Sequence, residues 1–107
     1  MFFGSTSSSY DNIKVDQIEE ELKNGATLVD IRNNSAYSAG HIEGAVNIPI
    51  KSLPFKMKEL DKDKPVVVIC YVGGSSKMAS KLLSKSGYTV KNVIGGMQAW
   101  NGKVVTS

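Results

Sequence analysis

The chain alternates short β-branched runs with stretches in which apolar residues recur every three or four positions. The most apolar run is PVVVIC, residues 65–70, which has no alternating polar residues. A run of this kind is typical of a central strand that is covered on both faces. Weaker runs of strand-forming residues predict four further strands, at residues 10–15, 27–31, 44–50 and 88–96.

Two helices are predicted in the first half of the chain by their end signals. Residues 16–25 form a short helix in which Asp16 is the N-cap, Glu19 completes a capping box and a glycine ends the last turn. Residues 33–40 form a helical turn that begins at Asn34 and also ends at a glycine.

Three later segments also have helical character. Residues 97–102 form a short helix, and residues 51–64 are weakly helical. In residues 75–87, apolar side chains recur at helical spacing, as two pairs: Met78 with Leu82, and Ala79 with Leu83. In the weak helix, three side chains are expected to face inward: Phe55, Met57 and Leu60.

Strands and helices therefore alternate along the chain, which predicts an α/β fold with a largely parallel sheet. A chain of 107 residues is long enough for one ordinary hydrophobic core. We expect a single domain at residues 10–107, preceded by a flexible, Ser-rich tail at residues 1–9. The tail has no basic start and no long apolar segment, so it does not resemble a secretion signal.

Composition argues against several classes of protein. Hydrophobic residues make up 41% of the chain and charged residues 21%, as in globular proteins. The net charge is +3, but the lysines are dispersed, so no nucleic-acid partner is expected. One cysteine and one histidine allow no internal disulfide and too few ligands for a structural zinc ion. We therefore expect no metal or other cofactor, no contact with membranes and a reducing, cytoplasmic location.

Candidate chemistry centres on the only cysteine, Cys70. It ends the predicted central strand, and ligands of open α/β sheets bind beyond the carboxyl ends of the strands. Residues 71–75 are enough to curl around the sulfur, and Gly73 and Gly74 permit the positive φ angles that such a curl needs. Successive amide groups in that conformation bind anions. The loop is therefore predicted to hold a negative charge.

Simple energetics indicate that this loop can hold a thiolate without a general base. Ser75 or Ser76 is expected to be the N-cap of the following helix. The N-terminus of a helix favours an anion by up to about 2 kcal/mol, and an amide bond to a charged group adds about 1.5–3 kcal/mol. Two amides and the helix would together keep Cys70 ionised at neutral pH.

Other chemistries of cysteine or phosphate fit this stretch less well. The sequence CYVGGSSK lacks the Walker pattern of nucleotide-binding loops. Residues 71–77 also lack the arginine with which a cysteine-dependent phosphatase would clamp a phosphoryl group. A cysteine protease needs a histidine base, and His41, the one histidine, is expected instead to tie local backbone together.

Three ordered motifs resemble the rhodanese family. LVDIRNNSAYSAGHIEGAVNIP, residues 28–49, resembles its N-terminal signature, and GGMQAW, residues 95–100, resembles its C-terminal signature. Between them, VVVICYVGGSSKMA, residues 66–79, is similar to the active loop of single-domain rhodaneses. The resemblance extends over about residues 10–103.

This resemblance implies a rhodanese-like fold, with a five-stranded, mostly parallel sheet flanked by helices on both faces. It also implies a thiosulfate sulfurtransferase, in which the Cys70 thiolate takes sulfur from thiosulfate or another persulfide donor. The resulting persulfide would be held by loop amides and passed to cyanide, a thiol or an acceptor protein. We expect the substrate to be bound by residues of the loop and its surroundings: Tyr71, Val72, Gly73, Gly74, Ser75, Ser76, Lys77 and Arg32.

Two alternatives stay open beside such an enzyme. Many rhodaneses carry arginines at the positions of Tyr71 and Ser75, so backbone amides must do most of the anion binding here. A non-enzymatic sulfur carrier or interaction module with the same loop is therefore the second hypothesis. An arsenate reductase or phosphatase is the third and ranks lower, because its longer loop would end in an arginine where this chain has Ser76.

A few residues outside the loop are expected to support it. Asp30 and Arg32 form an Asp-x-Arg pair at a strand end, which we interpret as an ion pair that braces the sheet edge, with Arg32 also able to attract an anionic donor. Lys77 opposes the helix dipole at its position, which suggests anion steering. Met97 and Trp100 are assigned to core packing.

Overall fold

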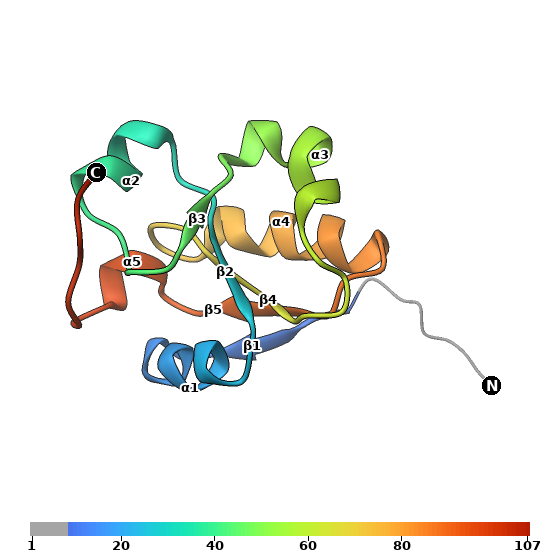
Figure 1. Cartoon of the computed structure of the whole chain (residues 1–107), viewed down its shortest axis with the longest axis horizontal. Helices are drawn as coiled ribbons and strands as arrows, with labels where there is room; N and C mark the ends of the chain where they lie inside the picture. The colour runs from blue at the N-terminus through green and yellow to red at the C-terminus, as the bar shows by residue number, and fades with distance from the viewer. Residues whose placement is uncertain (1–8) are drawn as a thin grey trace.

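Within the part of the chain that the structure describes, five strands form one sheet in the order β1-β5-β4-β2-β3 (Figure 1). The structure is a computed structural model that describes residues 9–107, so residues 1–8 of the predicted tail lie outside it. Every strand pair in the sheet is parallel, which confirms the predicted α/β fold. The strands are β1 (Asp11–Ile13), β2 (Thr27–Asp30), β3 (Val46–Asn47), β4 (Val66–Ile69) and β5 (Val90–Val93).

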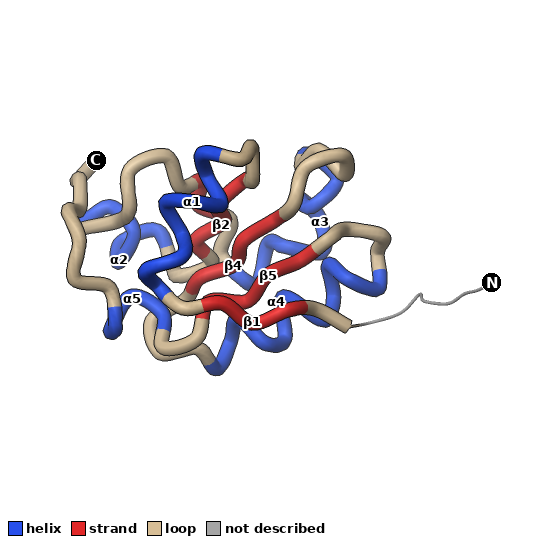
Figure 2. Tube along the Cα trace, turned by 90° about the horizontal axis from the view of Figure 1, so that it is seen from below, coloured by secondary structure: helices blue, strands red, loops and turns tan. Residues whose placement is uncertain are grey.

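Helices cover both faces of the sheet, as the resemblance implies (Figure 2). Two of them pack on one face through Leu53 and Leu83, and others pack on the opposite face through Ile18 and Met97. Short 3-10 turns precede α1 and flank α3. The helices are α1 (Ile18–Lys23), α2 (Asn34–Ala39), α3 (Leu53–Lys56), α4 (Gly74–Lys85) and α5 (Gly96–Ala99).

The central strand β4 separates two hydrophobic clusters. Val66 and Val68 face the cluster under α3 and α4, and Val67 and Ile69 face the cluster under α1. All four side chains are fully buried. This explains the uninterrupted β-branched run at residues 66–69, because both faces of this strand are buried.

The predicted start of the first helix is wrong. Asp16 is not an N-cap but lies in the 3-10 turn Val15–Gln17, which precedes α1. The backbone amide of Lys14 donates to Gln17 Oε1 at 2.8 Å, so a glutamine two residues before Glu19 closes this turn. The chain leaves the helix at Gly25 with φ +97°, where the sequence predicts its end.

The cap of α2 is one residue earlier than predicted. Asn33 Oδ1 accepts a hydrogen bond from the Ala36 amide at 2.8 Å, because Asn33 has the extended backbone that an N-cap needs. Asn34 is the first helical residue, and its side chain donates instead to Asn47 Oδ1 at 3.2 Å.

The inward faces of two helices also differ from the prediction. A 3-10 turn starts the segment at residues 50–52, so α3 begins at Leu53, which is fully buried. Phe55 lies two residues further, about 200° around the helix, and is 74% exposed. Met57 and Leu60 pack against the core as predicted. In α4, Ala79 and Leu83 are buried and Leu82 packs against their cluster, whereas Met78 is 70% exposed.

Candidate active site

The single thiol lies at the carboxyl edge of the sheet. Cys70 follows β4 directly and is only 5% exposed. Residues 71–73 turn the chain, and α4 begins at Gly74. This places the thiol between the end of a buried strand and the N-terminus of a helix of 12 residues, whose first amides have no partner within the helix.

Gly73 shapes the turn around the sulfur. Its amide lies 2.9 Å from Cys70 Sγ and donates to it. It is also the N-cap of α4, with φ +103°, a conformation that favours glycine. The predicted caps are therefore wrong: Ser75 and Ser76 lie in the first turn of the helix, because the glycine before them already makes the turn.

The C-terminal segment holds the loop from outside. The amide of Met97 donates to the Cys70 carbonyl oxygen, and the amide of Gln98 donates to that of Tyr71, both at 2.8 Å. Gly96 makes this approach possible, since a Cβ there would lie 2.4 Å from the Cys70 carbonyl oxygen. In the sequence, the glycine pair of GGMQAW is the signal for this close approach. The pair nevertheless has no role in the predicted site.

A cavity of about 720 Å³ opens beside Cys70. Five of the predicted site residues line it: Arg32, Cys70, Tyr71, Val72 and Ser75. Most of its wall is apolar and comes from the end of β2, from α2 and from the segment after β3: Ile31, Ala36, Ala39, Pro49 and Ile50. The remaining lining residues are polar: Asn33 and Lys51.

The other predicted loop residues face elsewhere. Gly73, Gly74 and Lys77 line a smaller hollow of about 310 Å³, and Val72 lines both spaces. Ser76 is fully buried, its hydroxyl oxygen has no hydrogen-bond partner, and it does not line the cavity beside Cys70. A substrate contact through the Ser76 side chain is therefore not supported by its position.

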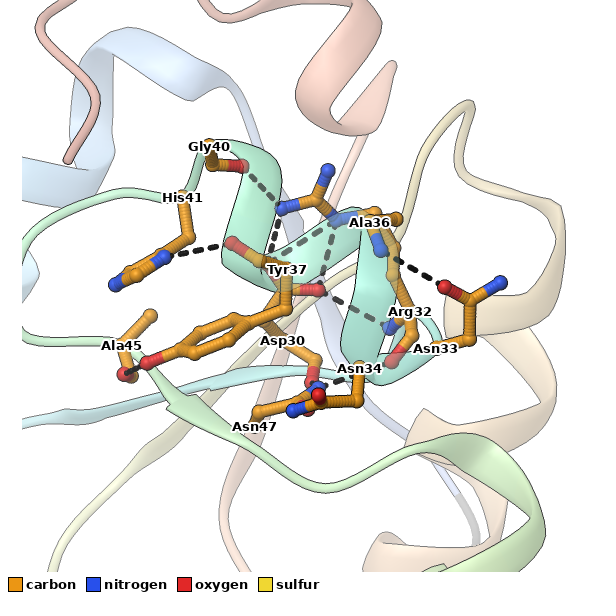
Figure 3. Close-up of polar contacts among 10 residues, drawn as sticks. All are labelled: Asp30, Arg32, Asn33, Asn34, Ala36, Tyr37, Gly40, His41, Ala45 and Asn47. Atoms are coloured by element: carbon orange, nitrogen blue, oxygen red, sulfur yellow. Dashed lines mark hydrogen bonds and ion pairs between the residues drawn. The ribbon is translucent and has the colours of Figure 1, made fainter. Parts of the chain in front are cut away.

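Asp30 and Arg32 form the ion pair that the sequence suggests (Figure 3). Asp30 is fully buried, and its carboxylate accepts from Arg32 Nη2 at 2.7 Å and from Arg32 Nε at 3.0 and 3.1 Å. The same Nη2 also donates to the Gly40 carbonyl oxygen at 2.8 Å. The guanidinium is thus fixed between β2 and the end of α2.

His41 lies in local backbone contacts (Figure 3). Its Nδ1 donates to the Tyr37 carbonyl oxygen at 2.7 Å, and its ring stacks on the Tyr37 ring with 3.7 Å between centroids. Its backbone pairs with Val105 near the end of the chain. His41 is not among the residues that line the cavity beside Cys70, so the geometry gives it no contact with a bound substrate.

Two other features of the described chain bear on its chemistry. Within residues 9–107, no three His, Cys, Asp or Glu side chains are grouped so that they could hold a metal ion. In the same range, no helix has the length and hydropathy needed to cross a membrane.

Sequence reasoning missed Lys51 as a lining residue. It follows the segment that continues β3, and the carboxyl ends of parallel strands meet at one edge of a sheet. This rule, applied to residues 44–50 as it was to the strand before Cys70, would have placed Lys51 near the thiol.

The structure is therefore that of an α/β protein whose single cysteine lies at the carboxyl edge of a parallel sheet, beside the N-terminus of α4. The chain belongs to the rhodanese-like domain family, whose sequence profile matches residues 14–103. It is 34% identical over 96 residues to the thiosulfate sulfurtransferase GlpE of Shewanella oneidensis, across 88% of this chain and 95% of that protein. The family therefore includes sulfurtransferases.

Solved structures share this fold. A rhodanese-related protein from Thermoplasma volcanium superposes with a TM-score of 0.85 and 35% identity, over 92% of this chain and all of that one. A rhodanese-like domain protein from Staphylococcus aureus gives a TM-score of 0.82 and 26% identity, over 91% and 98% of the two chains. The match to CoADR-RHD of Bacillus anthracis, with a TM-score of 0.80 and 32% identity, covers 84% of this chain but 16% of that much longer one.

Proposed function

We propose that this protein is a sulfurtransferase that carries sulfane sulfur on Cys70. The observation that carries the proposal is the position of the thiol, which lies in a cavity and accepts the Gly73 amide at 2.9 Å. A backbone N–H aimed at the sulfur is suited to stabilise the negative charge that the sulfur carries during sulfur transfer. The similarity to the thiosulfate sulfurtransferase of Shewanella oneidensis supports the same chemistry.

In the first half-reaction, the Cys70 thiolate attacks the outer sulfur of thiosulfate. The S–S bond of thiosulfate breaks, and its electron pair leaves with sulfite. The new S–S bond makes a cysteine persulfide, whose outer sulfur carries the negative charge. The amides at the start of α4 stabilise this charge, so no general base is required.

In the second half-reaction, a nucleophile removes the outer sulfur. Cyanide attacks that sulfur, the S–S bond to Cys70 breaks, and the thiolate leaves with its electron pair as thiocyanate is released. In a cell, a thiol or an acceptor protein would take the place of cyanide. Because the donor product departs before the acceptor binds, the kinetics should be ping-pong.

The cavity also admits a donor larger than thiosulfate. Its volume of about 720 Å³ lies within the range of small-molecule sites, and its wall is mostly apolar. An organic persulfide could place its organic part against Ile31 and Ile50 and its outer sulfur at Cys70. Such a donor would leave as a thiolate after the same attack. A lone reactive thiol of this kind suits a reducing compartment such as the cytoplasm.

Intact mass spectrometry tests the proposal directly. After treatment with thiosulfate or an organic persulfide, the protein should gain the mass of one sulfur atom, and cyanide should remove it. Cys70→Ala should gain none, and Cys70→Ser, which keeps the size of the side chain, should also gain none. An unchanged mass of the wild-type protein with all donors would exclude the persulfide mechanism.

Steady-state turnover separates an enzyme from a sulfur carrier. An enzyme should produce thiocyanate continuously from thiosulfate and cyanide, and Cys70→Ala should reduce this rate to that of the buffer. A protein that loads one sulfur but does not turn over would be a carrier. Release of phosphate from a phosphoester, or reduction of arsenate, that depends on Cys70 would contradict sulfur transfer as the main activity.

A further inference from the structure

The cavity beside Cys70 has an unbalanced positive charge. Two cationic residues line it, Arg32 and Lys51, and no aspartate or glutamate is among the described residues of its wall. A sulfur donor is an anion, whether it is thiosulfate or a persulfide. One of these two side chains could therefore bind the negative charge of the sulfur donor.

The charge of Arg32 is already balanced. Its guanidinium is paired with the buried Asp30 carboxylate and also donates to the Gly40 carbonyl oxygen. To contact a ligand through these same donors, it would have to leave a carboxylate that is fully shielded from water. Breaking such a buried pair is costly. The remaining nitrogen, Nη1, belongs to a guanidinium whose charge Asp30 already offsets, so Arg32 serves mainly to brace the wall.

Lys51, in contrast, has no counter-charge. Its side chain is exposed, and among residues 9–107 no carboxylate lies within ion-pair distance of its ammonium group. Its backbone position is nevertheless fixed on both sides. The Ile50 amide donates to the Ile31 carbonyl oxygen at 3.1 Å, and Leu53 is anchored in the core.

We propose that Lys51 binds the negative charge of the sulfur donor at the cavity beside Cys70. This inference rests on the proposed sulfur transfer and names the side chain that supplies the charge. Tyr71, Val72 and Ser75, which follow Cys70 and line the same cavity, carry no charge, so the cation comes from outside this loop. An ammonium group on a flexible stem can follow donors of different size.

The test measures how fast Cys70 is loaded with sulfur at limiting thiosulfate. Lys51→Gln should lower this second-order rate about tenfold, because one hydrogen bond to a charged group is lost. Lys51→Arg should restore most of the rate. Salt should slow the wild-type reaction clearly and the Lys51→Gln reaction much less, since the attraction is screened. Lys56→Gln is the control, because Lys56 is exposed nearby but does not line the cavity.

The possible results separate this inference from the proposed function. If wild-type protein and Lys51→Gln load at the same rate with the same dependence on salt, Lys51 does not bind the donor, and sulfur transfer stands. If Lys56→Gln slows loading as much as Lys51→Gln, the slowing reflects the overall charge of the protein, and the assignment to Lys51 is wrong. If the wild-type protein takes up no sulfur from any donor, both proposals fail.

Discussion

Gly96 is the residue at which the loop after Cys70 meets the C-terminal segment. Its φ is +58°, and a Cβ would lie 2.4 Å from the Cys70 carbonyl oxygen and 2.5 Å from that of Tyr71. A side chain of any size must therefore push α5 away from the loop. The two hydrogen bonds from Met97 and Gln98 would then lengthen or break.

We expect Gly96→Ala to damage both stability and chemistry. Gly44→Ala is a matched control, because Gly44 has φ +91° but nothing within 4 Å of a Cβ. The control should lose about 1 kcal/mol of unfolding free energy through backbone strain alone. Gly96→Ala should lose more than that, and its folded fraction should load sulfur on Cys70 more slowly. Urea unfolding and mass spectrometry measure the two effects.

Equal losses of stability in the two glycine variants, with normal loading of Gly96→Ala, would contradict this view of the loop. In that case the contact between α5 and the loop would be incidental to both the fold and the reaction.

At the scale of elements, the sequence predicts which segments form better than which side chains they bury. Every predicted strand and helix is present, because the β-branched runs and glycine terminators are local signals. The prediction that Phe55 faces inward is wrong because a 3-10 turn at residues 50–52 sets the rotation of α3. That turn is held by the hydrogen bond from the Ile50 amide to the Ile31 carbonyl oxygen, just after β2, which no local pattern reveals.

The rotation of α3 can be tested with two substitutions two residues apart. Leu53→Ala removes a fully buried side chain and should cost about 2–5 kcal/mol of unfolding free energy. Phe55→Ala removes a larger side chain that is 74% exposed and should cost less than about 1 kcal/mol. Denaturant titration gives both values. A larger loss for Phe55→Ala would mean that the helix is rotated as the sequence alone predicts.

At the scale of the whole molecule, stability should decrease from the centre of the sheet to its edges. β4 is paired on both sides and buried on both faces, whereas β3 is a short edge strand with exposed Val46. Backbone amides of β4 should exchange their hydrogens only when the whole protein unfolds. The amides around β3 should exchange faster, by local opening. Exchange followed by NMR would contradict this gradient if both strands were protected equally.

The position of the site and part of its lining could be predicted from the sequence, but the rest of the lining could not. The strand end, the glycines and the single cysteine place the thiol at the carboxyl edge, and the structure puts it there. Lys51 is missed because the end of residues 44–50 was not placed at the same edge of the sheet. Gly96 is missed because only the packing of α5 brings it to the loop. The burial of Ser76 is missed for a similar reason, since it depends on how α4 packs against the sheet.

The two hydrogen bonds between α5 and the loop after Cys70 also have a consequence for how the protein is made. Cys70 is synthesised before residues 96–98, whose glycine and amides hold its loop. A chain emerging from the ribosome therefore exposes the thiol before its surroundings are complete. A chain truncated before Gly96 lacks these contacts, so its Cys70 should load sulfur more slowly than that of the full chain, as intact mass spectrometry would measure.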